Sequence, residues 1–351
     1  MKKPTRKMRE WNRIHARLSN RRRLASKEIR IALGRRVSGN SHSPIQIGSH
    51  KVVPRMTVVC PEDFSLETNF DGVVNTLRKI REGTTRKRSD VVYVDFRKIR
   101  SLSPSAALVL AAELDRWNNL PRRGRLRSID VPQWDPSVRS LLADMGFFEL
   151  LSVNPPPAEP QRTTRYVKFR TGKVAEGEVI DRLRLDDLEP MVGPMPGRIH
   201  LYNAVTEAMT NVAQHAYKDT RSHRPHWWLS ASVDEDSVTV MIYDQGAGIP
   251  ATLPRKFSEQ IRKIVQEDHA MMIRAAHELQ RTRHDEKYRG HGLERDVRGY
   301  LQYLDRGQYR VISLKGEYVF EPLTEDSPHR VYKHSHPLLG TLIEWRLRKI
   351  V

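Results

Sequence analysis

The feature that most constrains the fold is a proline-rich segment, Asn154–Thr164, which carries no apolar period and separates two regions of different pattern. Before this segment, strand-like runs alternate with helix-like runs. After it, one helix precedes several segments with strand patterns. We therefore expect an α/β chain with a basic tail and linker at residues 1–50, one domain at residues 51–153, a connector at residues 154–164 and a second domain at residues 165–351.

The first of these domains shows a regular alternation of elements. Strands are predicted at residues 56–61, 90–96 and 124–131, and helices at residues 69–83, 103–117 and 135–151. Ser103 precedes Pro104, which is the favoured order of an N-cap residue and a first helical residue. Alternating strands and helices indicate an α/β layer.

The second domain contains the helix "NAVTEAMTNVAQHAY", residues 203–217. Its small and apolar residues have helical period, which predicts a helix that packs on a core. Glu207, Asn211 and His215 follow one another at intervals of four, so they share one face of an α-helix. A carboxylate, an amide oxygen and an imidazole could converge there on a charged ligand. The alternative is an amphipathic helix with an ordinary solvated face.

Downstream, "HWWLSASVDEDSVTVMIYD" predicts a hairpin that turns around residues 234–236. The loop "DQGAGIP", Asp244–Pro250, follows directly. Gly246 and Gly248 would let a flat ligand approach the backbone, and the carboxylate of Asp244 could accept a hydrogen bond from an exocyclic amine. An ordinary structural turn remains the alternative.

A further glycine-containing segment, "RGHGL", comprises Arg289, Gly290, His291, Gly292 and Leu293 and precedes a helical run. Backbone N–H groups at a helix start favour phosphate oxygens, and the arginine would add a charge-assisted contact. A glycine at an ordinary helix start is the alternative. The last segments, "YRVISLKGEYVFEP" and "GTLIEWRLRKI", alternate at period two and are expected to close a sheet.

These motifs, in this order and followed by Gly340-Thr341 before a final strand, resemble the GHKL superfamily of ATP-binding domains. This superfamily shares the Bergerat fold, an α/β sandwich in which helices cover a mixed sheet. The resemblance covers residues 165–351 and is nearest in motif style to the anti-sigma-factor serine kinases. It implies binding of ATP and Mg²⁺, with the segment from Leu253 to Tyr288 as a mobile lid over the nucleotide.

The resemblance also implies a role for each matching residue. Glu207 matches the carboxylate that positions or deprotonates the attacking water or hydroxyl, and Asn211 matches the Mg²⁺ ligand. Asp244 matches the acid that reads adenine. The remaining matches are His215 at the end of the first motif, Gly246 and Gly248 beside the base, Arg289, Gly290, His291, Gly292 and Leu293 around the phosphates, and Thr341 near the adenine pocket. The phosphate loop has two glycines where many members have three.

Residues 56–153 resemble a STAS domain, the fold of the anti-sigma-factor antagonists. Ser105 occupies the position at a helix start where that family often has a phosphorylated residue. However, Ser103 replaces the usual acidic residue two positions earlier, and Ala106 replaces the usual glycine. The resemblance therefore implies a domain that binds a protein partner, and an unmodified binding domain is favoured over a phosphoswitch.

Charge is concentrated at the amino terminus. The whole chain carries a net charge of +19, and residues 1–36 contain 14 Lys and Arg against two Glu. This segment could bind nucleic acid or an acidic protein surface, or it could serve solubility alone. No apolar run is long enough to span a bilayer and no secretory signal is visible, so a cytoplasmic location without membrane contact is expected. Cys60, the single cysteine, is expected to be a small buried hydrophobe.

Three functional hypotheses follow from the sequence. The first is a regulatory switch that binds Mg·ATP and contains a STAS-like interaction domain, with slow ATP hydrolysis or serine-kinase activity. The second is an ATP-dependent homodimeric clamp that holds nucleic acid through the basic tail; it ranks lower because we expect no transducer domain of the kind that such machines carry after the ATPase. The third is nucleotide binding without turnover.

Overall fold

The computed structural model describes residues 56–84, 91–120, 125–155, 163–195, 198–217, 225–253, 268–279, 307–322 and 328–348, together with the backbone of strands β1 (Ile45–Ile47) and β2 (His50–Val52). These two strands pair antiparallel within a stretch predicted to be a linker. The basic segment at residues 1–36 and residues 156–162 of the predicted connector lie outside the described residues. No described helix is long and apolar enough to cross a bilayer.

The amino-terminal region, residues 56–155, has the predicted alternation of strands and helices. Its elements are β3 (Met56–Val59), β4 (Asp63–Phe64), α2 (Phe70–Thr84), β5 (Val91–Asp95), β6 (Ser101–Leu102), α3 (Pro104–Asn119), β7 (Arg125–Ser128), η1 (Val131–Gln133), α4 (Pro136–Asp144) and α5 (Phe147–Leu151). Strands β3, β5 and β7 form a parallel sheet in that order. Because successive crossovers of the same hand run in one direction, they place α2 and α3 on one face of this sheet.

Side chains at the helix starts explain where two of these helices begin. The Ser103 hydroxyl accepts a 3.3 Å hydrogen bond from the Ala106 amide, so it caps α3 as predicted. The Asp135 carboxylate caps α4 in the same way. The single helix predicted for residues 135–151 is divided into α4 and α5. The break occurs at Gly146, whose φ of +83° is a left-handed conformation that interrupts a helix.

The carboxy-terminal region, residues 163–348, contains one large sheet. Its elements are β8 (Arg165–Tyr166), β9 (Arg170–Gly172), α6 (Gly177–Arg182), η2 (Leu183–Leu188), α7 (Glu189–Val192), α8 (Arg198–Asn211), η3 (Val212–Ala216), β10 (Trp227–Val233), β11 (Ser237–Asp244), α9 (Ile249–Thr252), α11 (His269–Leu279), β12 (Gly307–Phe320) and β13 (His329–Arg348). The strand order is β12-β13-β11-β10-β8, and β9 also pairs with β10.

All described pairings in this sheet are antiparallel, which corrects the expectation of a mixed sheet. The reason is local. Strands β10 and β11 follow each other through a tight turn, as do β12 and β13 through a short connection, and neighbours joined in this way pair antiparallel. Parallel pairing is confined, in the described chain, to the amino-terminal region.

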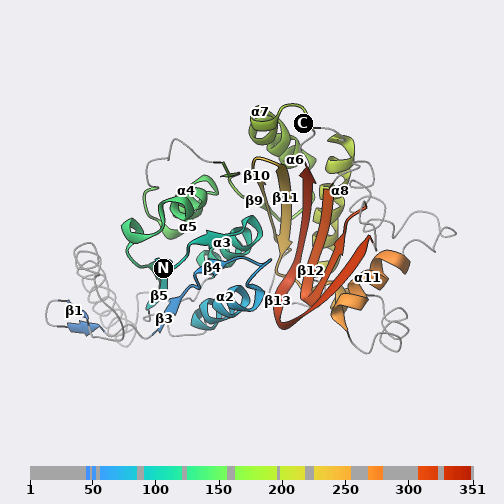
Figure 1. Cartoon of the computed structure of the whole chain (residues 1–351). Helices are drawn as coiled ribbons and strands as arrows, with labels where there is room; N and C mark the ends of the chain where they lie inside the picture. Colours follow the sequence, from blue (N-terminus) through green and yellow to red (C-terminus); the bar gives the residue numbers. More distant parts are fainter. Residues whose placement is uncertain are drawn as a thin grey trace, which may run out of the picture.

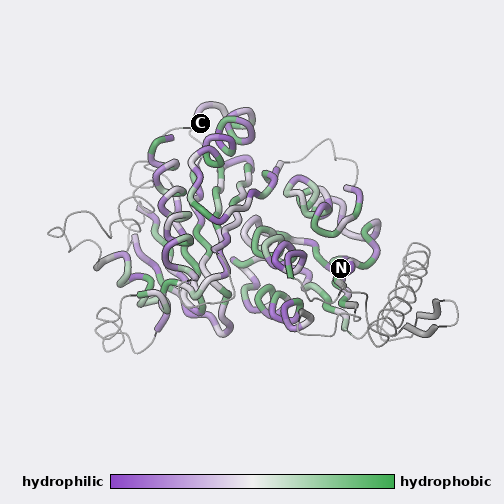
Figure 2. The backbone as a smooth tube through the Cα atoms, turned by 180° about the vertical axis from the view of Figure 1, so that it is seen from behind, coloured by the Kyte–Doolittle hydropathy of each residue, from purple (hydrophilic) through white to green (hydrophobic). Residues whose placement is uncertain are grey.

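The large sheet lies between helices on both of its faces (Figure 1). Helix α8 covers what we call the front face, and helices α2 and α3 of the amino-terminal region cover the back face. Hydropathy colouring shows hydrophobic residues along the strands of this sheet (Figure 2). Trp227 points to the front and Trp228 to the back, and both are buried within the packed layers, as expected for core residues. Cys60 is also buried.

The two regions share one hydrophobic core. The core of the amino-terminal region continues without a break into the back face of the large sheet, where it includes Trp228, Met241, Tyr243, Ile312, Leu338 and Leu342. The Tyr166 hydroxyl donates a 2.7 Å hydrogen bond to the Leu102 carbonyl, and the Phe169 amide donates to the Met145 carbonyl at 3.1 Å. The two regions predicted as separate domains are therefore packed directly against each other.

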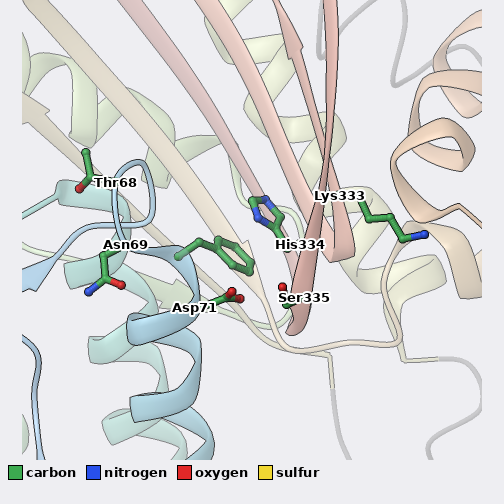
Figure 3. A pocket seen from close by; sticks show the side chains of 7 residues that line it. Thr68, Asn69, Asp71, Lys333, His334 and Ser335 are labelled. Atoms are coloured by element: carbon green, nitrogen blue, oxygen red, sulfur yellow. The ribbon is translucent and has the colours of Figure 1, made fainter.

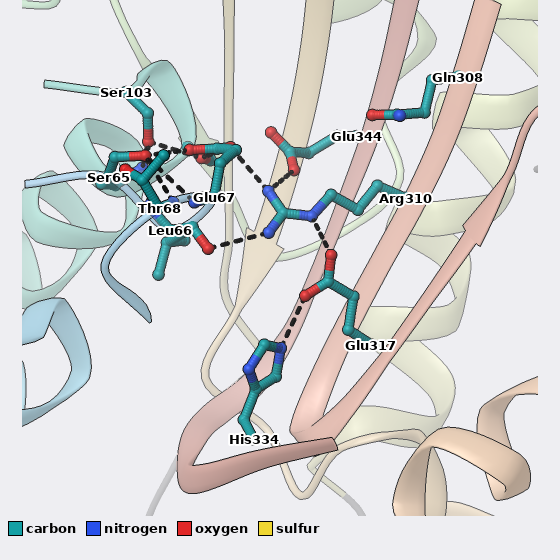
Figure 4. A network of polar contacts seen from close by, with 12 residues as sticks. Ser65, Leu66, Glu67, Thr68, Ser103, Gln308, Arg310, Glu317, His334 and Glu344 are labelled. Carbon is teal, nitrogen blue, oxygen red and sulfur yellow. Dashed lines mark hydrogen bonds and ion pairs between the residues drawn. The ribbon is translucent and has the colours of Figure 1, made fainter. Parts of the chain in front are cut away.

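A buried arginine crosses the same boundary (Figure 4). Arg310 of β12 forms ion pairs with Glu317 at 2.7 Å and Glu344 at 3.0 Å, both within the large sheet. It also forms an ion pair with Glu67 at 2.7 Å and donates to the Leu66 carbonyl at 3.0 Å, both in the amino-terminal region. The guanidinium therefore joins the two regions directly.

Candidate functional site

Helix α8 presents two of the three predicted polar residues at the edge of the core. Leu201, Ala204, Val205, Ala208 and Met209 are its buried residues and pack toward the front face of the sheet. Glu207 and Asn211 are partly buried, whereas His215 is exposed. The helix thus has the predicted amphipathic character, with the carboxylate and the amide at the boundary between core and solvent.

The last turn of this helix is not α-helical. Residues Val212–Ala216 form a π-helical turn, η3, so the α-helical geometry predicted through residue 217 ends at Asn211. Single π turns within helices occur frequently at functional sites. The consequence here is a close contact, because the Ala216 carbonyl accepts a 2.7 Å hydrogen bond from the Ala247 amide of the loop after β11.

The two glycines of that loop are required for packing within the protein. A Cβ on Gly246 would collide with the Ala216 carbonyl. Gly248 has a φ of +85°, and a Cβ there would lie 2.8 Å from the Ser313 hydroxyl. We predicted that the glycines leave space for a flat ligand. This prediction is wrong for the positions that their Cβ atoms would occupy. The chain itself fills these positions, and a ligand would contact the loop from another side.

Asp244 ends β11 and is only 5% exposed. Its Oδ1 accepts a 2.6 Å hydrogen bond from the Gly246 amide, the one hydrogen bond to this carboxyl group among the described residues. Burial raises the pKa of Asp244 to about 7, and the Gly246 hydrogen bond only partly opposes this rise. A buried carboxyl group with an unused acceptor oxygen is suited to a ligand that brings its own donor.

Strands β12 and β13 complete the surroundings of Asp244. Thr341 is its direct partner across the β11–β13 ladder and is 7% exposed. The Ser313 hydroxyl lies 3.1 Å from the Thr341 hydroxyl and accepts a 2.9 Å hydrogen bond from the Ile249 amide. These contacts fix the Asp244–Gly248 loop against a bulge in β12.

The side-chain amide of Asn211 is only partly satisfied by the protein. Its Nδ2 atom is buried and finds no hydrogen-bond partner among the described residues. An unpartnered buried polar atom costs about 1–3 kcal/mol, which a ligand could recover. If the amide is rotated by half a turn, Oδ1 takes this position, and an amide oxygen suits Mg²⁺. No cluster of three or more acidic, histidine or cysteine side chains that could hold a metal occurs in the described chain, so Mg²⁺ would depend on phosphate oxygens and water for its other ligands.

Other predicted site residues lie outside the described part of the chain. Arg289, Gly290, His291, Gly292 and Leu293 lie outside the described residues, as do residues 254–267 and 280–288 of the predicted lid. The described part of that lid, α11, packs on the sheet. His277 of α11 is fully buried, and its imidazole stacks on Tyr318 with ring centroids 4.7 Å apart. This helix is therefore anchored rather than a free cover.

The structure adds residues that the motifs did not single out. Tyr217 donates to the His226 carbonyl at 3.1 Å and accepts a 3.0 Å hydrogen bond from the Gln245 amide, so it supports the Asp244 loop. Ser313 supports the other end of the loop. Their roles depend on contacts between segments far apart in the chain, so no local pattern indicates them.

A polar hollow lies elsewhere in the described chain. It has a volume of about 280 Å³ and is lined by residues at the start of α2 and in β13, among them Asn69, Asp71, Lys333, His334 and Ser335 (Figure 3). Phe70 stacks on His334 there with ring centroids 3.6 Å apart. This hollow belongs to the boundary between the two regions and contains none of the predicted site residues.

Comparison with known families gives an independent result. Residues 194–294 match the family described as the histidine kinase-like ATPase domain. The match spans α8, β10, β11, the Asp244 loop and the segment from Arg289 to Leu293. No curated protein sequence matches the chain. The match supports the prediction, made from the motifs, of a histidine kinase-like ATPase domain in this part of the chain.

Proposed function

We propose that the chain binds Mg·ATP on the front side of the large sheet, beside α8–η3 and the Asp244–Gly248 loop, and that it acts as a nucleotide-dependent regulatory protein. The buried Asp244 carboxyl group carries this proposal, because its unused acceptor oxygen is suited to the exocyclic amine of adenine. Gly246, Gly248 and Thr341 would form the walls beside the base. Guanine presents a carbonyl oxygen at the corresponding position, so the site would favour adenine.

The other motif residues would handle the triphosphate. Asn211 would provide an amide oxygen to Mg²⁺, which shields phosphate charge. His215, four residues further along the chain, would contact a phosphate group at the end of the helix. Arg289, Gly290, His291, Gly292 and Leu293 would contact the phosphates through backbone N–H groups and one guanidinium. Glu207 precedes Asn211 by one helical turn and would act as general base toward water or a hydroxyl group.

A binding measurement tests the adenine contact. We expect Asp244→Asn to lower ATP affinity at least about tenfold, because the substituted amide would offer its own donor or a weaker acceptor to the amine. Asp186→Asn is the matched control, since Asp186 is an exposed carboxylate in η2 and its loss should leave affinity unchanged. Titration calorimetry with ATP and with GTP would give both affinities. Equal affinity in wild type and Asp244→Asn would refute the proposed contact.

The pH dependence of binding offers a second test. An amine donor prefers the ionised form of Asp244, and the pKa of this carboxyl group is raised to about 7. Affinity should therefore fall as pH drops below about 7, by at most about tenfold per pH unit, and should level off above it. In Asp244→Asn this dependence should disappear.

Hydrolysis and phosphotransfer can be measured separately from ATP binding, through their products. Slow hydrolysis would release inorganic phosphate, and kinase activity would label a protein hydroxyl. Ser105 is fully buried, and α3, which carries it, covers the back face of the sheet, opposite α8. Transfer to Ser105 within one docked chain would therefore require the regions to separate. Incubation with radiolabelled ATP, with Glu207→Ala beside wild type, should show free phosphate that the variant does not release.

Residues 56–153 would supply the regulatory output as a STAS-like domain that binds a protein partner. Helices α2 and α3 already cover the back face of the large sheet, so a partner would use the remaining surface of this region. The alternative is a nucleic-acid clamp that dimerises with ATP and grips through residues 1–36. It predicts salt-dependent binding to DNA or RNA, which removal of these residues should abolish.

A further inference from the structure

The loop that would read adenine also touches the amino-terminal region. Gln245 follows Asp244 directly in the chain. Its side-chain Nε2 donates a 3.2 Å hydrogen bond to Oε2 of Glu113 in α3, which belongs to the other region. The backbone amide of Gln245 donates to Tyr217 at the end of the α8–η3 helix. This one residue thus contacts both sides of the sheet.

Glu113 is a rigid acceptor. It is fully buried, and its carboxylate forms a 2.5 Å ion pair with Arg81 of α2 and a second ion pair with Arg116 of α3. Two guanidinium groups hold the carboxylate in place, since a buried charge with two such partners has little freedom to reorient. The position of Gln245 is therefore set by α2 and α3.

A second contact supports the same connection. The Trp228 indole on β10 donates a 2.9 Å hydrogen bond to Asp115 of α3, and the neighbouring His226 provides the carbonyl that accepts from Tyr217. Tyr217 in turn accepts from the Gln245 amide. Helix α3 is thus connected to the loop through Gln245 and through the start of β10.

The Gln245 amide is only partly satisfied in this arrangement. Its Oε1 atom is buried without a hydrogen-bond partner among the described residues. A buried acceptor without a donor is unfavourable, so the Glu113 contact must hold Gln245 against this cost. The side chain is therefore sensitive to any shift of the loop on one side or of α3 on the other.

We propose that Glu113 and Gln245 couple nucleotide binding to the docking of the amino-terminal region. Glu113 acts as a positioning residue, which holds the Asp244 loop through Gln245 in the form that accepts the base. Coupling between two sites is reciprocal, so ATP should in turn stabilise the docked position of α3. This inference rests on the proposed ATP function.

A charge exchange tests the contact. In Gln245→Glu, two carboxylates face each other, and ATP affinity should fall about tenfold or more. Adding Glu113→Gln restores an amide–carboxylate pair in reverse order and should recover most of the lost affinity. Gln133→Glu, which adds the same charge at an exposed residue of η1, is the control and should bind ATP like wild type. Thermal unfolding would show whether each variant is folded.

The outcomes separate the two proposals. If wild type does not bind ATP, the proposed function fails and the coupling fails with it. If wild type binds ATP and Gln245→Glu binds equally well, the coupling alone is refuted. A weakened Gln245→Glu that Glu113→Gln does not restore would also refute it, because this pattern means that residue 245 affects the nucleotide directly.

Hydrogen exchange gives a readout that does not depend on these charges, and it serves if the double variant fails to fold. In wild type, saturating ATP should slow amide exchange in α3, which contacts the loop through Glu113, more than in α4, which packs against α5 and β8. In Gln245→Met, which removes the amide and keeps similar size, the additional protection of α3 should be lost. Equal protection of α3 in both proteins would overturn the proposal.

Discussion

The two faces of the large sheet are both buried, yet they are built differently. On the front face, β10 and β11 present Trp227, Leu229, Ala231, Val233, Val238, Val240 and Ile242, all in the core beneath α8. On the back face, the same two strands present Ser230, Ser232 and Thr239 beside Trp228, Met241 and Tyr243. Arg310 and Glu344 are also buried on this back face. The front is a conventional apolar core, whereas the back combines apolar contacts with charge.

This difference indicates how each face selects what covers it. Apolar packing is tolerant of its partner, but a buried charge is stable only with the correct counter-charges in place. Glu317 and Glu344 belong to the large sheet itself, so Arg310 is partly compensated before docking. Glu67 and the Leu66 carbonyl complete the set from the amino-terminal region. Docking on the back face is therefore specific in a way that packing on the front is not.

Removing the charge at the centre of the back face should have the largest effect. We expect Arg310→Leu to lower the free energy of unfolding by about 3–5 kcal/mol, because it leaves buried carboxylates without their counter-charge. Urea denaturation followed by tryptophan fluorescence would measure the loss. Arg346→Leu on the neighbouring strand is the matched control, since this arginine is exposed and its loss should cost less than about 0.5 kcal/mol. Similar losses in the two variants would show that the Arg310 cluster does not hold the back face.

Truncating one buried side chain on each face compares how much packing on the two faces contributes to stability. Leu229→Ala on the front and Met241→Ala on the back remove fully buried side chains, and each should cost about 2–5 kcal/mol. Both side chains are completely buried, so the two losses should be similar. A loss below about 1 kcal/mol for Met241→Ala alone would mean that the back face opens readily in solution.

Two buried carboxyl groups, Asp244 and Glu344, should make the free energy of unfolding depend on pH. Burial raises the pKa of both Asp244 and Glu344 to about 7, and at Glu344 the Arg310 guanidinium opposes this rise while the charges of Glu67 and Glu317 add to it. A carboxyl group with a raised pKa in the folded state holds its proton more tightly than in the unfolded state. Its contribution to the free energy of unfolding is therefore favourable at low pH and is lost as pH rises from about 4 through about 7.

Accordingly, Asp244→Asn should gain stability relative to wild type as pH rises over this range, on the order of 1–3 kcal/mol in total. Glu344→Gln should gain less, because it also loses an ion pair with Arg310. Urea midpoints at pH 5, 6, 7 and 8 would give both profiles. A flat difference between Asp244→Asn and wild type would contradict the raised pKa of Asp244.

The smallest effect concerns the helix caps. Ser103→Ala and Asp135→Ala each remove a cap and should cost about 1 kcal/mol. Ser103 also accepts a 3.3 Å hydrogen bond from the Leu66 amide, next to Glu67 at the boundary of the back face. Its removal should therefore cost somewhat more than removal of Asp135, which caps α4. The reverse order would show that the Leu66 contact contributes nothing.

Local sequence patterns predicted the helices and strands well where a single capping residue or the period of the apolar residues determines the element. Ser103-Pro104 and Asp135-Pro136 marked two helix starts, and the hairpin of β10 and β11 turns at the predicted residues. Prediction failed where a distant contact decides. The π turn at Val212–Ala216 meets the Ala247 amide, and the glycines of the Asp244 loop pack against Ala216 and Ser313, which lie in other segments of the chain.

The candidate site divides in the same way. Its residue types and order, from Glu207 and Asn211 to Asp244, are visible in the sequence, because a ligand site needs particular chemical groups on particular elements. The pairing of Asp244 with Thr341 follows from the β11–β13 ladder, and the burial that raises the pKa of Asp244 follows from packing. Neither can be obtained from local spacing.

By itself, the sequence determined which segments become strands and helices, and which chemical groups the candidate site offers, because these depend on near neighbours and on side-chain chemistry. Only the tertiary structure decided what covers the back face of the large sheet. A strand buried on both faces has the same apolar pattern whichever element covers it. The contacts of Arg310 with Glu67 and of Gln245 with Glu113 join residues more than a hundred positions apart, and only the folded chain brings them together.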